Sequence, residues 1–179
     1  MEPRDESTQL PQMPQMPSGV WETTDPAETG PRPNYASWGS RAAAWIIDNL
    51  ILAIPWGIAV GLIIAASAEE DDGGDAGGLW VLGVLATAAA IIIPFVYYAI
   101  LNGNERGQTL GKRAMGIRVR KKDGVSPLGT GRALGRYAVV AVVASFLGPL
   151  ILVDYLWPLW DADNQALHDK VVDSIVVRA

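Results

Sequence analysis

Two long stretches without a charged side chain constrain this sequence more than any other feature. Residues 49–68 form a stretch of 20 residues, and residues 79–101 form one of 23. A helix needs about 20 mostly apolar residues to cross the hydrocarbon core of a bilayer, where it must satisfy its own backbone hydrogen bonds. The sequence therefore predicts an all-α membrane protein with spans at about 42–68 and 79–101.

A third apolar segment, at about 134–160, is interrupted by Asp154 and divided by Gly148-Pro149. Two alternatives follow. A single span would end near Trp160 and leave the C-terminus on the opposite side of the membrane. A broken helix or hairpin would return the C-terminus to the side where the segment began. The apolar pattern of residues 174–178 favours a strand that pairs with residues 117–120, which requires the second alternative.

The charges of the connecting segments differ in sign. The loop at 69–78 carries five acidic residues and no base, whereas residues 102–136 carry nine Lys and Arg and two acids. The positive-inside rule predicts that residues 102–136 and the N-terminus face the cytoplasm at a plasma membrane. The lipid bilayer is then the main partner, and we expect the basic loop to contact anionic headgroups.

Residues 1–37 are rich in Pro, Thr, Glu and Gln and contain a short Pro-Gln-Met repeat. Such a composition buries too little apolar surface to offset the entropy lost on ordering. We expect a disordered tail at 1–37, followed by a transmembrane domain at 38–179. A proline-rich ligand for a partner protein is the alternative, but the repeat is short and lacks a basic anchor.

Asp48 is the most informative single residue, because it lies inside the first predicted span. A carboxylate at that depth costs a few kcal/mol unless it is paired or hydrated. Arg41 lies on the same helical face but its side chain leans away, so we expect a partner from another helix. Arg136 is the first candidate, and Arg132 lies on the same face as Arg136. Two interpretations stand: an ion pair that fixes helix packing, or a carboxylate that binds a proton or cation.

The remaining polar residues give little indication of chemistry. We expect Asp154 to be a surface aspartate at a helix end, and Asp169 to cap a helix or pair with the basic segment. The sequence has one histidine, His168, and no cysteine, so we expect no metal, cofactor or enzymatic activity. Residues 107–113 lack the spacing of a phosphate-binding loop, and no nucleic-acid partner is expected.

Several pieces of the sequence form the pattern of one known family: Ser40–Ala42 with Asp48, Gly107–Arg113, Gly116–Val119, Arg132–Arg136 and Leu167–Lys170. By these pieces the chain resembles the RDD family of bacterial membrane proteins, which is named for one arginine and two aspartates. The resemblance implies that Arg41 is the family arginine and Asp48 the first aspartate. It assigns the second aspartate to Asp169, with Asp154 as the alternative. The proline-rich N-terminus is similar to mycobacterial proline-rich antigens.

The resemblance implies transport of unspecified ligands, and for some members sodium/proton antiport. We therefore expect a small transporter in which a cation and a proton compete for Asp48, with Arg41 or Arg136 as its charge partner. So few helices hardly enclose a pathway, which favours a homo-oligomer, and Gly57 and Gly61 form a small-residue packing motif. The rival hypothesis is a membrane scaffold without transport, which binds partners or lipids through its tail and basic loop.

Overall fold

The computed structural model describes residues 33–179. The predicted disordered tail lies mostly outside these residues. Its last five residues, 33–37, run beside the C-terminal strand β2 (Ser174–Arg178). Tyr35 forms a bridge to Val177, and the Ala36 N–H donates to the carbonyl oxygen of Val176 at 2.9 Å. The described chain thus begins as an extended segment against β2, a few residues before the first helix.

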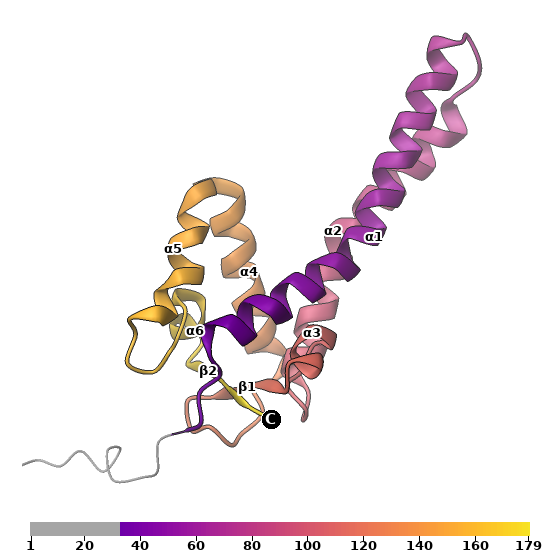
Figure 1. Cartoon of the computed structure of the whole chain (residues 1–179). Helices are drawn as coiled ribbons and strands as arrows, with labels where there is room; N and C mark the ends of the chain where they lie inside the picture. Colours follow the sequence, from indigo (N-terminus) through magenta and orange to yellow (C-terminus); the bar gives the residue numbers. More distant parts are fainter. Residues whose placement is uncertain (1–32) are drawn as a thin grey trace, which may run out of the picture. The chain divides into compact units, whose positions relative to one another are not determined.

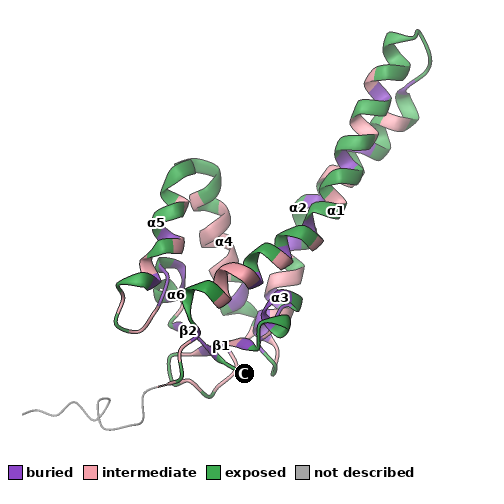
Figure 2. Ribbon diagram, viewed as in Figure 1, coloured by how far each residue is buried: buried purple, intermediate pink, exposed green. Residues whose placement is uncertain are grey.

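The first two apolar stretches form a helical hairpin of α1 (Trp38–Asp71) and α2 (Gly77–Gly103), seen in Figure 1. Their lengths of about 50 Å and 40 Å exceed the roughly 30 Å of bilayer hydrocarbon. Pro55 and Pro94 lie inside them, as membrane helices tolerate. Most residues of the hairpin are exposed (Figure 2), and many are large aliphatic side chains. Such a surface is suited to lipid and not to water.

The third apolar segment folds back on itself. Helix α4 (Thr130–Leu147) is followed by three short helical pieces. These are the 3-10 helix η2 (Gly148–Leu150), the α-helix α5 (Ile151–Leu156) and the 3-10 helix η3 (Trp157–Leu159). Gly148 has φ +44°, a value that favours glycine, and Pro149 has no N–H for the α4 ladder. These two residues end α4, and α5 then packs back against it. The alternative of a broken helix is therefore confirmed.

A small antiparallel sheet lies beside residues 33–37. Strand β1 (Ile117–Lys121) pairs with β2, in a register that places Val119 opposite Val176. The sheet buries Ile117, Val119 and Val176 almost fully. The short helices α3 (Leu110–Ala114) and α6 (Leu167–Val171) precede the two strands. The predicted pairing of the two strands is confirmed, so residues 117–121 and the C-terminus lie on the same side of the apolar helices.

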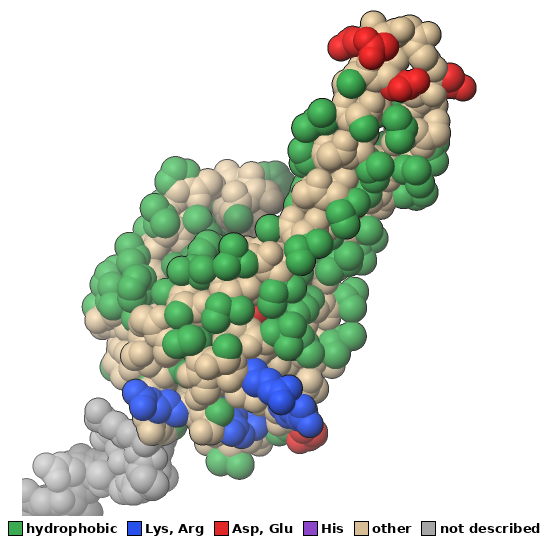
Figure 3. All heavy atoms as spheres, turned by 45° about the vertical axis from the view of Figure 1, so that its right-hand side comes forward, with side chains coloured by type: hydrophobic (Ala, Val, Ile, Leu, Met, Phe, Trp, Pro, Cys, Tyr) green, Lys and Arg blue, Asp and Glu red, His purple; other side chains and the backbone are tan. Residues whose placement is uncertain are grey.

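The charged side chains separate along the described chain, as Figure 3 shows. Acidic residues gather at the tip of the α1–α2 hairpin, while Lys and Arg side chains gather at the opposite end. Between them lie three segments long and apolar enough to cross a membrane: Trp38–Asp71, Gly77–Gly103 and Thr130–Leu159. The chain is a multi-pass membrane protein, and its fold is the expected mostly helical one with a two-stranded sheet.

Candidate functional site

Asp48 is buried in α1 and is held by three hydrogen-bond donors from other elements. Its Oδ1 accepts from the Tyr97 hydroxyl at 2.7 Å and from the Gly111 N–H at 2.8 Å. Its Oδ2 accepts from the Thr109 hydroxyl at 2.6 Å. The residue is only 2% exposed. Since a buried carboxylate needs such donors, this arrangement fastens α2 and α3 to α1.

The local sequence of α3 explains how two of these donors are presented. Thr109 is the N-cap, and its Oγ1 accepts from the Lys112 N–H at 3.2 Å while donating to Asp48. Gly111 lies so close to α1 that a Cβ atom there would clash with the carbonyl oxygen of Ala44. The sequence marks this segment as part of the basic loop and of the family pattern, but not as a source of donors to Asp48. A Thr that begins a helix two residues before a Gly is the signal that was missed.

Asp169 is fully buried and joins four parts of the chain. Its Oδ1 accepts from Arg136 Nε at 2.7 Å and from the Ser174 hydroxyl at 2.9 Å. Its Oδ2 accepts from Arg41 Nη1 and from the Ala166 N–H, each at 3.2 Å. Burial by itself would raise the pKa of Asp169, but the charges of Arg136, His168 and Arg41 hold it well below the usual range.

The two arginines predicted as charge partners of Asp48 do not pair with it in the structure. Arg136 was expected beside Asp48, but it pairs with Asp169 because the chain turns back after α4 and brings α6 next to α4. Arg132 is exposed and makes no ion pair or side-chain hydrogen bond within residues 33–179. The structure joins the family arginine assigned by resemblance, Arg41, to the second assigned aspartate, Asp169, at 3.2 Å.

Asp154 is not the surface aspartate that was expected. It is 4% exposed, and its Oδ2 lies 2.5 Å from Nδ1 of His168. Its Oδ1 accepts from the His168 N–H at 2.9 Å. The reason for its burial is the return of the chain, which packs α6 against α5. The pair therefore holds the end of the third apolar segment to the helix that carries Asp169.

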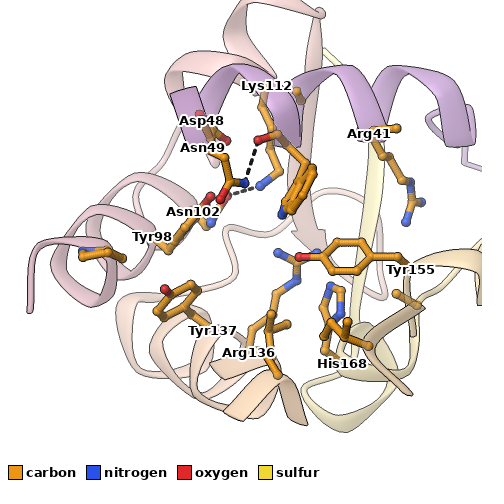
Figure 4. A pocket seen from close by; sticks show the side chains of 18 of the residues that line it. Arg41, Asp48, Asn49, Tyr98, Asn102, Lys112, Arg136, Tyr137, Tyr155 and His168 are labelled. Atoms are coloured by element: carbon orange, nitrogen blue, oxygen red, sulfur yellow. Dashed lines mark hydrogen bonds between the residues drawn. The ribbon is translucent and has the colours of Figure 1, made fainter. Parts of the chain in front are cut away.

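A cavity of about 880 Å³ lies between α1 and the α4–α5 hairpin. Figure 4 shows polar side chains reaching into it from several elements. One part of its lining is charged or polar, and the remainder is aromatic and aliphatic. The ionisable residues of the lining, apart from tyrosines, are Arg41, Asp48, Lys112, Arg136, His168 and Asp169. All three apolar segments contribute to the lining.

Lys112 is the charged residue of the cavity lining that was not a candidate site residue from the sequence. It is 8% exposed, and its Nζ donates to Oδ1 of Asn102 at 2.7 Å (Figure 4). The ammonium also lies 6.0 Å from the centre of the Tyr98 ring. Burial, followed by the nearby charge of Arg136, lowers the pKa of Lys112 to about 7. No group of three His, Cys, Asp or Glu side chains in residues 33–179 is arranged to hold a metal ion.

Comparison with known proteins gives one family and a few relatives. The model of the RDD family matches residues 35–173. The proline-rich antigen of Mycobacterium leprae is 28% identical over 81% of this chain and 61% of its own length. A proline-rich antigen homolog of Mycobacterium tuberculosis is 26% identical over 83% of this chain and 65% of its own. The chain thus spans less than two thirds of these relatives. No solved structure matches.

Proposed function

Because the chain belongs to the RDD family, we propose that it is a small transport protein whose ligand site is the cavity between α1 and the α4–α5 hairpin. The observation that carries the proposal is the cavity itself. Its volume of about 880 Å³ lies in the range of small-molecule sites. It combines apolar walls with a few convergent polar groups, which is the usual composition of such sites.

In this proposal the two aspartates build the site and do not bind the ligand. Asp48 accepts three hydrogen bonds from the protein itself, and Asp169 accepts four. A carboxylate has about four lone-pair positions, so little capacity remains for an outside donor or cation. Their role is to hold α1, α4, α3 and α6 around the cavity.

A single-cysteine experiment tests the transport proposal, because the chain has no native cysteine. Ala141→Cys places a thiol in the cavity wall, and Val142→Cys places one on the exposed apolar face of α4. Sealed vesicles are treated with a membrane-impermeant, charged thiol reagent from one side or the other. Transport requires that Ala141→Cys react from both sides, while Val142→Cys reacts from neither.

Reaction of Ala141→Cys from one side alone would contradict transport by this cavity. That result would favour the rival hypothesis, a membrane scaffold without transport. The rival is supported by the saturated hydrogen bonding of Asp48 and Asp169, which suits an architectural role. The matched thiol at Val142 controls for reagent that leaks through the membrane, since leakage would label both variants from both sides.

Cation/proton exchange on Asp48 is a second candidate. One observation favours it: Asp48 is a buried carboxylate in the cavity wall. Two observations oppose cation exchange. The oxygens of Asp48 already accept hydrogen bonds from three donors, and the three cationic side chains in the same cavity lining repel a cation. Sodium- and lithium-driven proton flux in vesicles tests the candidate. Flux in the wild type that Asp48→Asn abolishes would establish it, and an absence of flux in both would eliminate it.

The proposal also includes the location, the orientation and the oligomeric state of the protein. We place it in the plasma membrane, with the N-terminus and residues 102–136 in the cytoplasm and the acidic loop outside. The basic residues then lie near anionic headgroups. A homo-oligomer is part of the proposal too, since nothing in residues 33–179 would lie within 4 Å of a Cβ atom at Gly57 or Gly61. The proposal does not include enzymatic activity, a cofactor or a nucleic-acid partner.

A further inference from the structure

The cationic side chains of the cavity outnumber the carboxylates available to them. Arg41, Lys112 and Arg136 face it, together with Asp48 and Asp169. Asp169 pairs with both arginines, and Asp48 accepts from hydroxyl groups and a backbone N–H. Lys112 has no carboxylate within salt-bridge distance among residues 33–179. The lining therefore holds one ammonium group without a direct counter-ion.

Several of the donors are also unused. Lys112 Nζ has a single acceptor in the described chain, Asn102 Oδ1, for its three hydrogens. Arg136 uses only Nε, which leaves both of its Nη groups without an acceptor within residues 33–179. Nε of Arg41 is buried and has no partner in the described part of the chain. Arg41, Lys112 and Arg136 all line the cavity, so these open donors indicate an acceptor in the cavity that residues 33–179 do not supply.

Lys112 and Arg136 also repel each other. Figure 4 shows their side chains reaching into the same space, Lys112 from α3 and Arg136 from α4. The charge of Arg136 is, after burial, the largest influence that lowers the pKa of Lys112. An anion between the two side chains would accept hydrogen bonds from both and offset their repulsion. A guanidinium and an ammonium together are a common pair of donors for phosphate and carboxylate.

The remainder of the cavity is apolar and continues away from these donors. Its walls include Leu52 and Trp56 of α1, Val140 and Ala144 of α4, and Leu152 of α5. All five belong to segments apolar enough to cross a membrane. A small hydrophilic anion would leave these walls without a contact, whereas a hydrocarbon chain would fill the space between them.

We propose that the cavity binds an anionic amphiphile, with its acidic head at Lys112 and Arg136 and its hydrocarbon chain between α1 and the α4–α5 hairpin. This inference rests on the proposed function for the statement that the cavity is the ligand site. It adds the class of ligand, which is an acidic lipid-like molecule and not a metal cation or a free inorganic anion.

The test uses the full chain purified in an uncharged detergent. Binding of dodecyl phosphate, dodecanol and inorganic phosphate is measured by native mass spectrometry and by titration calorimetry. We expect one molecule of dodecyl phosphate per chain and much weaker binding of the other two compounds. Equal binding of dodecanol would overturn the role of the acidic head, and equal binding of inorganic phosphate would overturn the role of the hydrocarbon chain.

Two neighbouring residues of α3 give a matched pair of variants. Lys112→Gln and Arg113→Gln each remove one positive charge, but Arg113 is exposed. Lys112→Gln should weaken the binding of dodecyl phosphate by about tenfold or more, as expected for the loss of one charge-assisted hydrogen bond. Arg113→Gln should leave the affinity unchanged. Equal losses in both variants would indicate binding by net charge alone and would overturn the proposal.

A second pair covers the case in which Lys112→Gln fails to fold. Ala141→Trp fills the cavity without changing its charge, while Val142→Trp adds the same side chain to the exposed face of α4. The first variant should abolish binding of dodecyl phosphate and the second should not. Unchanged binding in Ala141→Trp would overturn the proposal.

The two proposals fail separately. Binding of dodecyl phosphate in detergent together with one-sided labelling of Ala141→Cys would sustain the ligand class and contradict transport. Two-sided labelling without selective binding of dodecyl phosphate would sustain transport and contradict the ligand class.

Discussion

Arg136 donates a hydrogen bond from Nε to Oδ1 of Asp169 at 2.7 Å, and the two residues lie on α4 and α6. The other carboxylate oxygen of Asp169 pairs with Arg41 of α1. One buried carboxylate therefore joins the start of the first apolar helix to the start of the third and to the C-terminal region. This arrangement closes the polar end of the cavity. It also explains why Arg136 is not the partner of Asp48.

Asp169→Asn should strongly destabilise the protein. The substitution removes the charge that offsets two largely buried guanidinium groups, and breaking a buried ion pair costs about 3–5 kcal/mol. Asp163→Asn is the control, because its pair with Lys122 at 3.6 Å is partly exposed and such pairs contribute about 1 kcal/mol or less. Thermal unfolding in detergent measures both. Similar losses in the two variants would contradict the central role of Asp169.

Removing a donor to Asp48 should destabilise the contact between α1 and α3. Thr109→Val preserves the shape of the side chain but removes the 2.6 Å hydrogen bond, at a cost of about 1–3 kcal/mol. The effect should be smaller in the Asp48→Asn background, because the bond then lacks its charged acceptor. Thermal unfolding of the four proteins gives the coupling energy. Additive effects would mean that Thr109 acts independently of Asp48.

Gly111→Ala should be far more harmful than Gly131→Ala. A Cβ at position 111 meets the carbonyl oxygen of Ala44, a backbone atom that has no room to move, whereas a Cβ at position 131 meets nothing within 4 Å. Gly131 lies in the first turn of α4, so alanine there should be neutral or slightly stabilising. Yield of folded protein and thermal unfolding measure the difference. An equal response would show that α3 can shift away from α1.

The stability of the protein should rise with pH above about 7 through Lys112. Its pKa is about 7 in the folded protein and about 10.4 in an unfolded chain. Between these values the unfolded chain binds more protons, so the free energy of unfolding increases with pH, by up to about 1.4 kcal/mol per unit. Lys112→Met should remove this dependence. The comparison of wild type with Lys112→Met between pH 7 and pH 10 isolates Lys112 from other titrating groups.

Much of the fold could be predicted from the sequence because it depends on local properties. Absence of charge over 20 or more residues predicts a span regardless of the neighbouring segments. The alternation of residues 117–120 and the apolar pattern of residues 174–178 predicted two strands, and their pairing required only that both lie on one side of the membrane. Gly148-Pro149 marked the break in the third segment. The cytoplasmic orientation stays a prediction.

The sequence by itself thus determined a membrane protein with three apolar segments and a strand pair at one end. Segment length, hydropathy and turn residues are local properties, and each can be evaluated without knowing which distant residues meet. Only the tertiary structure decided which charges meet. Asp154 became buried and Arg136 met Asp169 because the hairpin after Leu147 returned α6 to α4. Lys112 entered the cavity because Asp48 holds α3 against α1. Such contacts join residues far apart in sequence, and their energies depend on distance and burial, which no local pattern encodes.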